Sequence, residues 1–156
     1  MGTAPNSELE AQTTVSFWQA TAPHLLAVDW HSYSQLVLRP YGWTNQDSPD
    51  EDLLKEIGDG ISDAIYAVHG TRFTSQKSIE LYVTTGTAND WFYDEEATSL
   101  NKGYRAAGYT IELRDTGRYG FQLPPEQIIP SGEEQVPAVL YMVQRILRSP
   151  IEAKKH

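Results

Sequence analysis

Two short segments of the chain, residues 25–30 and 107–113, have the apolar character of buried strands. The first is a nearly continuous apolar run, which is typical of a strand covered on both faces. The second alternates, with Thr110 and Glu112 predicted on the face opposite its large apolar side chains. His31 directly follows the first segment. An imidazole and a carboxylate therefore stand at the ends of two predicted strands, where they could serve as metal ligand and general base.

Three further segments have the start signals of helices. Each begins with the Ser-x-x-Glu pattern of a capping box, in which the two side chains bond to free backbone N–H groups. The pattern occurs at Ser7–Glu10, Ser48–Glu51 and Ser131–Glu134. It predicts helices over residues 7–20, from residue 48 to a C-cap at Gly70, and from residue 131 to just before Pro150.

Apolar stripes at helical spacing are predicted to face the core on the last two helices. The stripe of the middle helix comprises Leu53, Leu54, Ile57, Ile61, Ala64, Ile65 and Val68. The stripe of the last helix comprises Val136, Val139, Leu140, Val143, Ile146 and Leu147.

Residues 35–39 and 79–84 are predicted as two more strands, and the polar stretch 94–106 as a surface loop. The predicted order is α-β-β-α-β-β-α, which indicates an α/β fold with a mixed β-sheet flanked by helices. We expect a single domain over residues 1–156. Four strands make a small sheet, so at least one edge should be bare.

The formal net charge of −9 argues against nucleic acid and anionic membrane surfaces as partners, because both attract clustered lysine and arginine. The only tight basic cluster, Lys154-Lys155, is predicted to be a solvated tail. The absence of cysteine excludes disulfides and thiolate zinc sites. No apolar run approaches the ~20 residues of a membrane span, and no signal peptide is expected at the N-terminus.

Four patches of sequence resemble the carboxypeptidase A/B family of zinc metallopeptidases in their order and approximate spacing. The first is HSYSQ with PYG, within residues 31–42. The second is LY, TG and DW, within residues 81–91, and the third is ELRDTGRYGF at residues 112–121. The fourth is LP, QIIP and EE, within residues 123–134. Together they cover nearly the whole chain.

The resemblance implies a site that removes C-terminal residues from peptides with Zn²⁺. His31 would be a zinc ligand, with Asp29 or a backbone carbonyl orienting its second nitrogen. Glu112 would be the general base towards zinc-bound water and then the acid towards the leaving amine. Tyr82 would close over the substrate, and Ser32 and Tyr33 would line the adjoining subsites.

The partner implied is a peptide or protein C-terminus, and family members are mostly secreted or vacuolar. Asn89 falls where the family sets the preference for the substrate's C-terminal side chain. An apolar residue there goes with apolar substrates and aspartate with basic ones, so Asn89 leaves the preference open.

Two features of the family are missing before His31. The family's other two zinc ligands come from a His-x-x-Glu motif, whereas the only histidine here is His24, with no glutamate three places on. The family's carboxylate-binding arginines also precede this point, but no arginine occurs before Arg39. The chain therefore resembles the C-terminal half of that family's three-layer fold, and we expect it to be inactive without the missing N-terminal half.

Two alternatives stay open at this stage. One is a non-catalytic remnant that binds peptide or protein through its exposed sheet edge. The other is an unstable product without a function of its own. Read without the resemblance, Glu112 would pair with Arg114 or Arg118.

Overall fold

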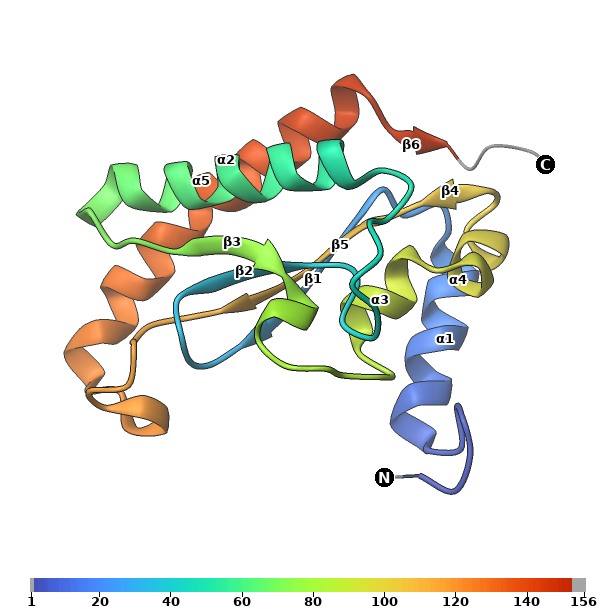
Figure 1. Ribbon diagram of the computed structural model, residues 1–156, viewed down its shortest axis with the longest axis horizontal. Helices are drawn as coiled ribbons and strands as arrows, with labels where there is room; N and C mark the ends of the chain where they lie inside the picture. Colours follow the sequence, from blue (N-terminus) through green and yellow to red (C-terminus); the bar gives the residue numbers. More distant parts are fainter. Residues whose placement is uncertain (1, 153–156) are drawn as a thin grey trace.

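Four strands form one mixed sheet in the order β1-β5-β2-β3 (Figure 1). The structure is a computed structural model that describes residues 2–152. Strand β5 (Ala107–Glu112) runs parallel to β1 (Leu26–His31) and antiparallel to β2 (Leu36–Arg39). Strand β2 is parallel to β3 (Thr74–Lys77). The predicted α/β class with a mixed sheet is confirmed, and β1 and β3 are the two edges.

Helices cover both faces of this sheet. Helices α2 (Glu51–His69) and α5 (Ile128–Arg148) pack on one face, and in Figure 1 α2 lies above the strands while α5 runs diagonally across it from the lower left. Helix α3 (Ala88–Tyr93) packs on β5 and β1 from the other face. Helices α1 (Leu9–Thr21) and α4 (Glu95–Leu100) lie beyond it. The remaining elements are short: η1 (Ser78–Glu80), η2 (Gly120–Gln122), η3 (Pro125–Gln127), and the pair β4 (Tyr104–Arg105) and β6 (Ile151–Glu152).

The main core lies between the sheet and the helices α2 and α5. Its fully buried side chains include Val37, Tyr109 and Ile111 of the sheet, Leu54, Ile57, Ile61 and Ile65 of α2, and Ala138 and Met142 of α5. The predicted alternation of β5 is therefore confirmed, as is most of the predicted stripe of α2. On the other face, α3 approaches β5 so closely that a Cβ at Gly108 would lie 2.6 Å from the carbonyl oxygen of Asn89.

The helix ends were predicted only in part. Gly70 closes α2 in the left-handed conformation (φ 74°), and its N–H donates to the Tyr66 carbonyl, as expected. The three capping boxes are wrong. Helices α1 and α2 begin after Glu8 and Asp50, and no side chain caps either one. Helix α5 begins at Ile128, three residues before Ser131, and Glu134 binds Arg114 instead of capping a helix start.

Two strand predictions need correction. Residues 79–84 do not form a strand, since β3 ends at Lys77, opposite Arg39. Pro40 follows Arg39 at the end of β2 and has no N–H with which to extend the pairing of β2 and β3. The residues after Lys77 form η1 instead. Strand β1 is not covered on both faces either: it is an edge strand, only half buried, and Trp30 is 44% exposed.

Residues 94–106 are not a plain surface loop. They contain α4 and β4, with Ala97 and Asn101 fully buried. The Asn101 amide accepts from the His24 N–H (2.5 Å) and donates to the carbonyls of His24 (2.6 Å) and Tyr104 (2.8 Å). The polar side chain of Asn101 is therefore buried with hydrogen-bond partners, which the polar composition of residues 94–106 did not indicate.

The apolar stripe of α5 was predicted to face the core, and this is wrong for all but one of its residues. Ile146 is buried. The other five are at least 36% exposed, and we call them the α5 outer stripe: Val136, Val139, Leu140, Val143 and Leu147. The core is contacted instead by the neighbouring side of the helix. The predicted tail at Lys154-Lys155 lies outside the described residues, and no helix within residues 2–152 is long and apolar enough to span a membrane.

Candidate active site

His31 and Glu112 are brought together at the ends of two adjacent strands. They are register partners in the parallel pair of β1 and β5. His31 Nδ1 lies 4.0 Å from Glu112 Oε1. The other ring nitrogen, Nε2, lies 2.8 Å from Asp29 Oδ2, two residues earlier on β1. Because Asp29 holds one nitrogen, the nitrogen left for a ligand is the one on the Glu112 side.

The carboxylate of Glu112 is poorly solvated. Its side chain is 14% exposed, and Oε2 is buried without a hydrogen-bond partner among the described residues. Burial raises the pKa of Glu112, and the charge of Asp29 adds to this, while His31 acts in the opposite direction. A raised pKa suits a carboxylate that must exchange a proton near neutral pH.

The turn after Glu112 is held together by Asp115. Its carboxylate accepts backbone N–H groups from Gly117 (2.9 Å), Tyr119 (2.8 Å) and Gly120 (3.1 Å). Desolvation acts to raise the pKa of Asp115, but these three bonds outweigh it and hold the pKa below its usual value. Gly117 has φ 114°, which favours glycine strongly. Asp115 therefore has a structural role in this turn.

Tyr33 packs onto this turn. Its ring meets Phe121 edge-on, with centroids 5.0 Å apart, and a Cβ at Gly120 would lie 3.1 Å from it. The loop that carries Tyr33 is tied to the end of β5, because Ser34 and Gln35 both donate N–H groups to the Leu113 carbonyl at 3.1 Å. Ser32 is exposed beside His31. The loop of Tyr33 is therefore fixed next to Glu112, through Leu113 and the turn at residues 117–121.

Arg114 does not pair with Glu112, which corrects one of the alternatives above. Its guanidinium donates to both carboxylate oxygens of Glu134 on α5, with Nε at 2.8 Å from Oε2. It also donates to Gln127 Oε1 (2.5 Å) and Thr71 Oγ1 (3.0 Å). Glu134 is completely buried. Sequence reasoning missed this pair, because Glu134 fitted a capping box equally well.

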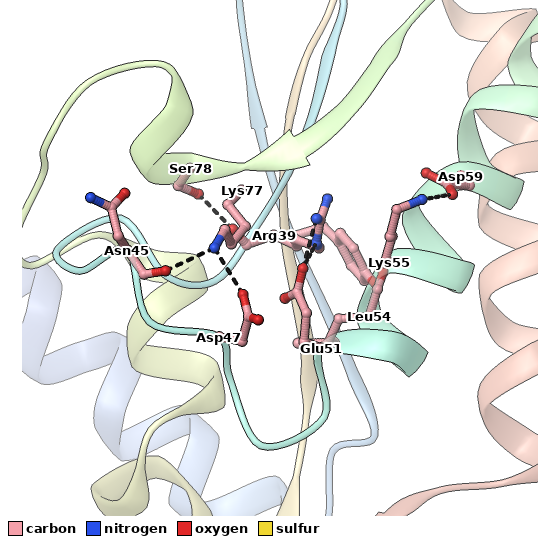
Figure 2. A network of polar contacts seen from close by, with 10 residues as sticks. Arg39, Asn45, Asp47, Glu51, Leu54, Lys55, Asp59, Lys77 and Ser78 are labelled. Carbon is pink, nitrogen blue, oxygen red and sulfur yellow. Dashed lines mark hydrogen bonds and ion pairs between the residues drawn. The ribbon is translucent and has the colours of Figure 1, made fainter.

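Asn89 is buried at the start of α3. Its amide donates to Ser78 Oγ (2.8 Å), and Ser78 donates to the carbonyl oxygen of Arg39 (3.0 Å). Figure 2 shows Ser78 beside Arg39, whose guanidinium binds Glu51 Oε1 at 2.7 and 2.9 Å. Asn89 is therefore the end of a polar chain that fixes its orientation. No sequence signal marked Ser78 as its partner.

In the same view, Lys77 binds the carbonyl of Asn45 and the carboxylate of Asp47, both at 2.9 Å. This fixes the loop that follows β2. Tyr82 comes after η1 and is 63% exposed, so it does not pack against the rest of the site. Tyr82 thus lies on the segment between η1 and α3, and Asn89 lies within α3.

The side chains present supply one of the ligands that a zinc site needs. His31 offers an oriented nitrogen, but a catalytic zinc takes three protein ligands. Within residues 2–152, no three histidine or acidic side chains gather into a group able to hold a metal. His24 does not substitute, since its Nε2 lies 3.0 Å from Thr21 Oγ1 and 3.1 Å from the Trp18 carbonyl. His24 therefore has a structural role between α1 and β1.

The family profile described as zinc carboxypeptidase matches residues 1–138 of the chain. The chain belongs to the zinc carboxypeptidase family. It is 42% identical over 150 residues to a metallocarboxypeptidase A-like protein of Trichophyton verrucosum, which covers 93% of this chain and 34% of that protein. It is 39% identical over 134 residues to mouse carboxypeptidase A4, covering 85% of this chain and 30% of that protein.

A solved structure has a similar fold. The structure of bovine thrombin-activatable fibrinolysis inhibitor in complex with tick carboxypeptidase inhibitor superimposes with a TM-score of 0.83 at 31% identity. It covers 94% of this chain, which covers 48% of that one. The chain spans about a third of the length of the curated carboxypeptidases it matches. The resemblance predicted from the four patches is confirmed, and the family implies Zn²⁺.

Proposed function

We propose that this chain supplies the C-terminal part of the catalytic domain of a zinc metallocarboxypeptidase, which removes C-terminal residues from peptides. The observation that carries the proposal is the pairing of His31 and Glu112. Their facing atoms are 4.0 Å apart at the ends of two parallel strands, with the far nitrogen of His31 held by Asp29. A ligand and a proton acceptor side by side are the combination that metal-assisted hydrolysis requires.

In this proposal His31 Nδ1 is a zinc ligand. Zinc, when bound, supplies a polarised water. Glu112 takes up a proton at its carboxylate and later returns one to the leaving amine. Its Oε2 atom is buried and unpartnered among the described residues, so a proton or substrate group could bind there without displacing another contact.

Substrate contacts are assigned to four residues. Tyr82, which is exposed on its loop, closes over the peptide. Ser32 and Tyr33 line the adjoining subsites next to Glu112. Asn89 contacts the C-terminal side chain of the peptide. Because Ser78 fixes the amide NH₂ of Asn89, we expect a preference that depends on polarity rather than on charge.

The remaining zinc ligands and the arginines for the substrate carboxylate come from polypeptide outside this chain. One imidazole holds zinc weakly, and without an arginine clamp the terminal carboxylate lacks a bidentate partner. We therefore propose that the chain alone is inactive. We also propose that the complete protein is secreted or vacuolar, which fractionation of culture medium and cells with an antibody against this chain would test.

The function is tested by complementation. The purified chain is mixed with the part of the Trichophyton verrucosum relative that lies outside the matching stretch, and release of C-terminal residues from peptides is measured with and without zinc. We expect no release by the chain alone, zinc-dependent release by the mixture, and loss of release with Glu112→Gln. A mixture that forms a complex and binds peptide without cleaving it would instead favour the non-catalytic alternative.

A further inference from the structure

Ser78 fixes which way round the side-chain amide of Asn89 lies. The Ser78 hydroxyl is 3.0 Å from the backbone carbonyl oxygen of Arg39 (Figure 2). Because a carbonyl oxygen can only accept, the hydroxyl proton points at Arg39, and the Ser78 oxygen is left to accept a bond in turn. The group of Asn89 that lies 2.8 Å from this oxygen is therefore its donating NH₂. The amide oxygen Oδ1 of Asn89 consequently points away from Ser78.

The surrounding structure leaves Asn89 little freedom to change this arrangement. Asn89 is 1% exposed and Ser78 6%, so the bond between them is shielded from water. Helix α3 lies close on β5, since a Cβ at Gly108 would be 2.6 Å from the backbone carbonyl oxygen of Asn89. The next residue, Asp90, accepts the Gly42 N–H at 2.9 and 3.1 Å. The amide of Asn89 could still turn over within these limits, and the bond to Ser78 opposes this.

The Oδ1 atom of Asn89 is an acceptor in search of a donor. Within residues 2–152, no group donates a hydrogen bond to it. The adjoining Asp90 supplies no donor either, because its carboxylate accepts from Gly42. A nearly buried acceptor lowers the free energy of a complex when it meets a donor, and raises it when it faces another acceptor. The orientation of Asn89 therefore selects between ligand groups by their hydrogen-bonding polarity.

We propose that Ser78 is a positioning residue that makes Asn89 a hydrogen-bond acceptor, so that the site prefers C-terminal side chains that donate a hydrogen bond. Glutamine represents this class, because its NH₂ would donate to Oδ1 of Asn89. An ester of the same chain length keeps the carbonyl group but has no donor, so two acceptors would face each other. The inference rests on the proposed function, in which Asn89 contacts the C-terminal side chain of the peptide.

Two peptides that differ only in their last residue test this preference. One ends in glutamine and the other in glutamate γ-methyl ester, which is also uncharged but lacks the NH₂ group. The chain is mixed with the part of the Trichophyton verrucosum relative that lies outside the matching stretch, and kcat/KM is measured for both peptides with zinc. We expect glutamine to be favoured by roughly 10-fold, which is the effect of one hydrogen bond in a desolvated site.

A Ser78→Ala variant separates positioning from support of the fold. Without the hydroxyl, the Asn89 amide can turn over and present either end, so the preference for glutamine should fall below about threefold. A purely structural defect would lower kcat/KM for both peptides by the same factor and leave their ratio unchanged. Ser62→Ala is the matched control, because the Ser62 hydroxyl also donates to a backbone carbonyl, that of Gly58 on α2. This control should keep the full preference.

Hydrogen exchange of side-chain amides measures the same bond in the chain alone, without activity. By NMR, the NH₂ protons of Asn89 should exchange roughly 10-fold more slowly than those of Asn45, which is exposed. Ser78→Ala should remove this protection. The NH₂ protons of Asn101, which is fully buried, should stay protected in the variant, which shows that the fold is intact.

Equal cleavage of the two peptides, or an unchanged preference in Ser78→Ala, would overturn the inference. Exchange of the Asn89 NH₂ as fast as that of Asn45 would overturn it as well. A mixture that forms a complex but releases no residue from either peptide would refute the proposed function. In that case the exchange result alone decides the role of Ser78: protection that depends on its hydroxyl supports the orientation of Asn89, and protection that does not depend on it contradicts it.

Discussion

Replacement of Glu134 by glutamine should lower the free energy of unfolding by about 3 kcal/mol. Glu134 is completely buried and accepts two N–H groups from Arg114, whose side chain is only 12% exposed. Removing one partner of a buried ion pair costs about 3–5 kcal/mol, because the other charge is left uncompensated. Arg114 keeps its bonds to Gln127 and Thr71, which places the loss at the lower end of that range.

The measurement is urea unfolding, followed by circular dichroism and tryptophan fluorescence. For a domain of this size, 3 kcal/mol corresponds to a fall in melting temperature of about 6–12 °C. Glu133→Gln is the matched control. It is the neighbouring residue, but its side chain is 54% exposed and its partner His69 is 37% exposed, so the loss should be below about 1 kcal/mol. Equal losses for the two variants would refute the assignment of Arg114 and Glu134 as a buried pair.

Three further outcomes are expected. Burial raises the pKa of Glu112, so the folded state favours the protonated form of this side chain. Protonated Glu112 therefore adds to the free energy of unfolding below the unfolded pKa of 4.5, and this stabilisation is lost as pH rises through the folded pKa. Glu112→Gln should therefore be more stable than the wild type in urea at pH 7, with the gain disappearing at pH 4. Gly108→Ala should cost about 2 kcal/mol in the same assay, because its Cβ would lie 2.6 Å from the Asn89 carbonyl; an unchanged midpoint would contradict the close packing of α3 on β5. The chain alone should bind the dye ANS or self-associate through the α5 outer stripe, whereas a dye-free monomer with a sharp melt would count against an uncovered face.

Much of the fold could be predicted from local sequence. The stripe of α2 and the alternation of β5 were predicted, because both elements bury one side against partners within the chain. The same reasoning failed for α5. Its periodicity was read correctly as a single apolar strip, but α5 is apolar on two sides, and the pattern does not say which side the chain itself covers.

The candidate site was predictable for a different reason. His31 and Glu112 end neighbouring strands, and their sequence context carried the family resemblance. The contacts that hold them were not predictable. The partner of Arg114 lies twenty positions away on α5, and nothing near Ser78 indicates that it binds Asn89. The cis peptide bonds at Ser32–Tyr33 and Arg114–Asp115 also leave no trace in residue type.

Zinc stoichiometry tests the central claim most directly, since the claim is that this chain holds one ligand of a site completed elsewhere. Metal is titrated into the chain and into its mixture with the complementary part of the Trichophyton relative, and retained zinc is measured after gel filtration. The account predicts no stoichiometric retention at micromolar zinc by the chain alone, and one ion per complex that is lost with His31→Ala. One tightly held ion per chain without any partner would contradict it.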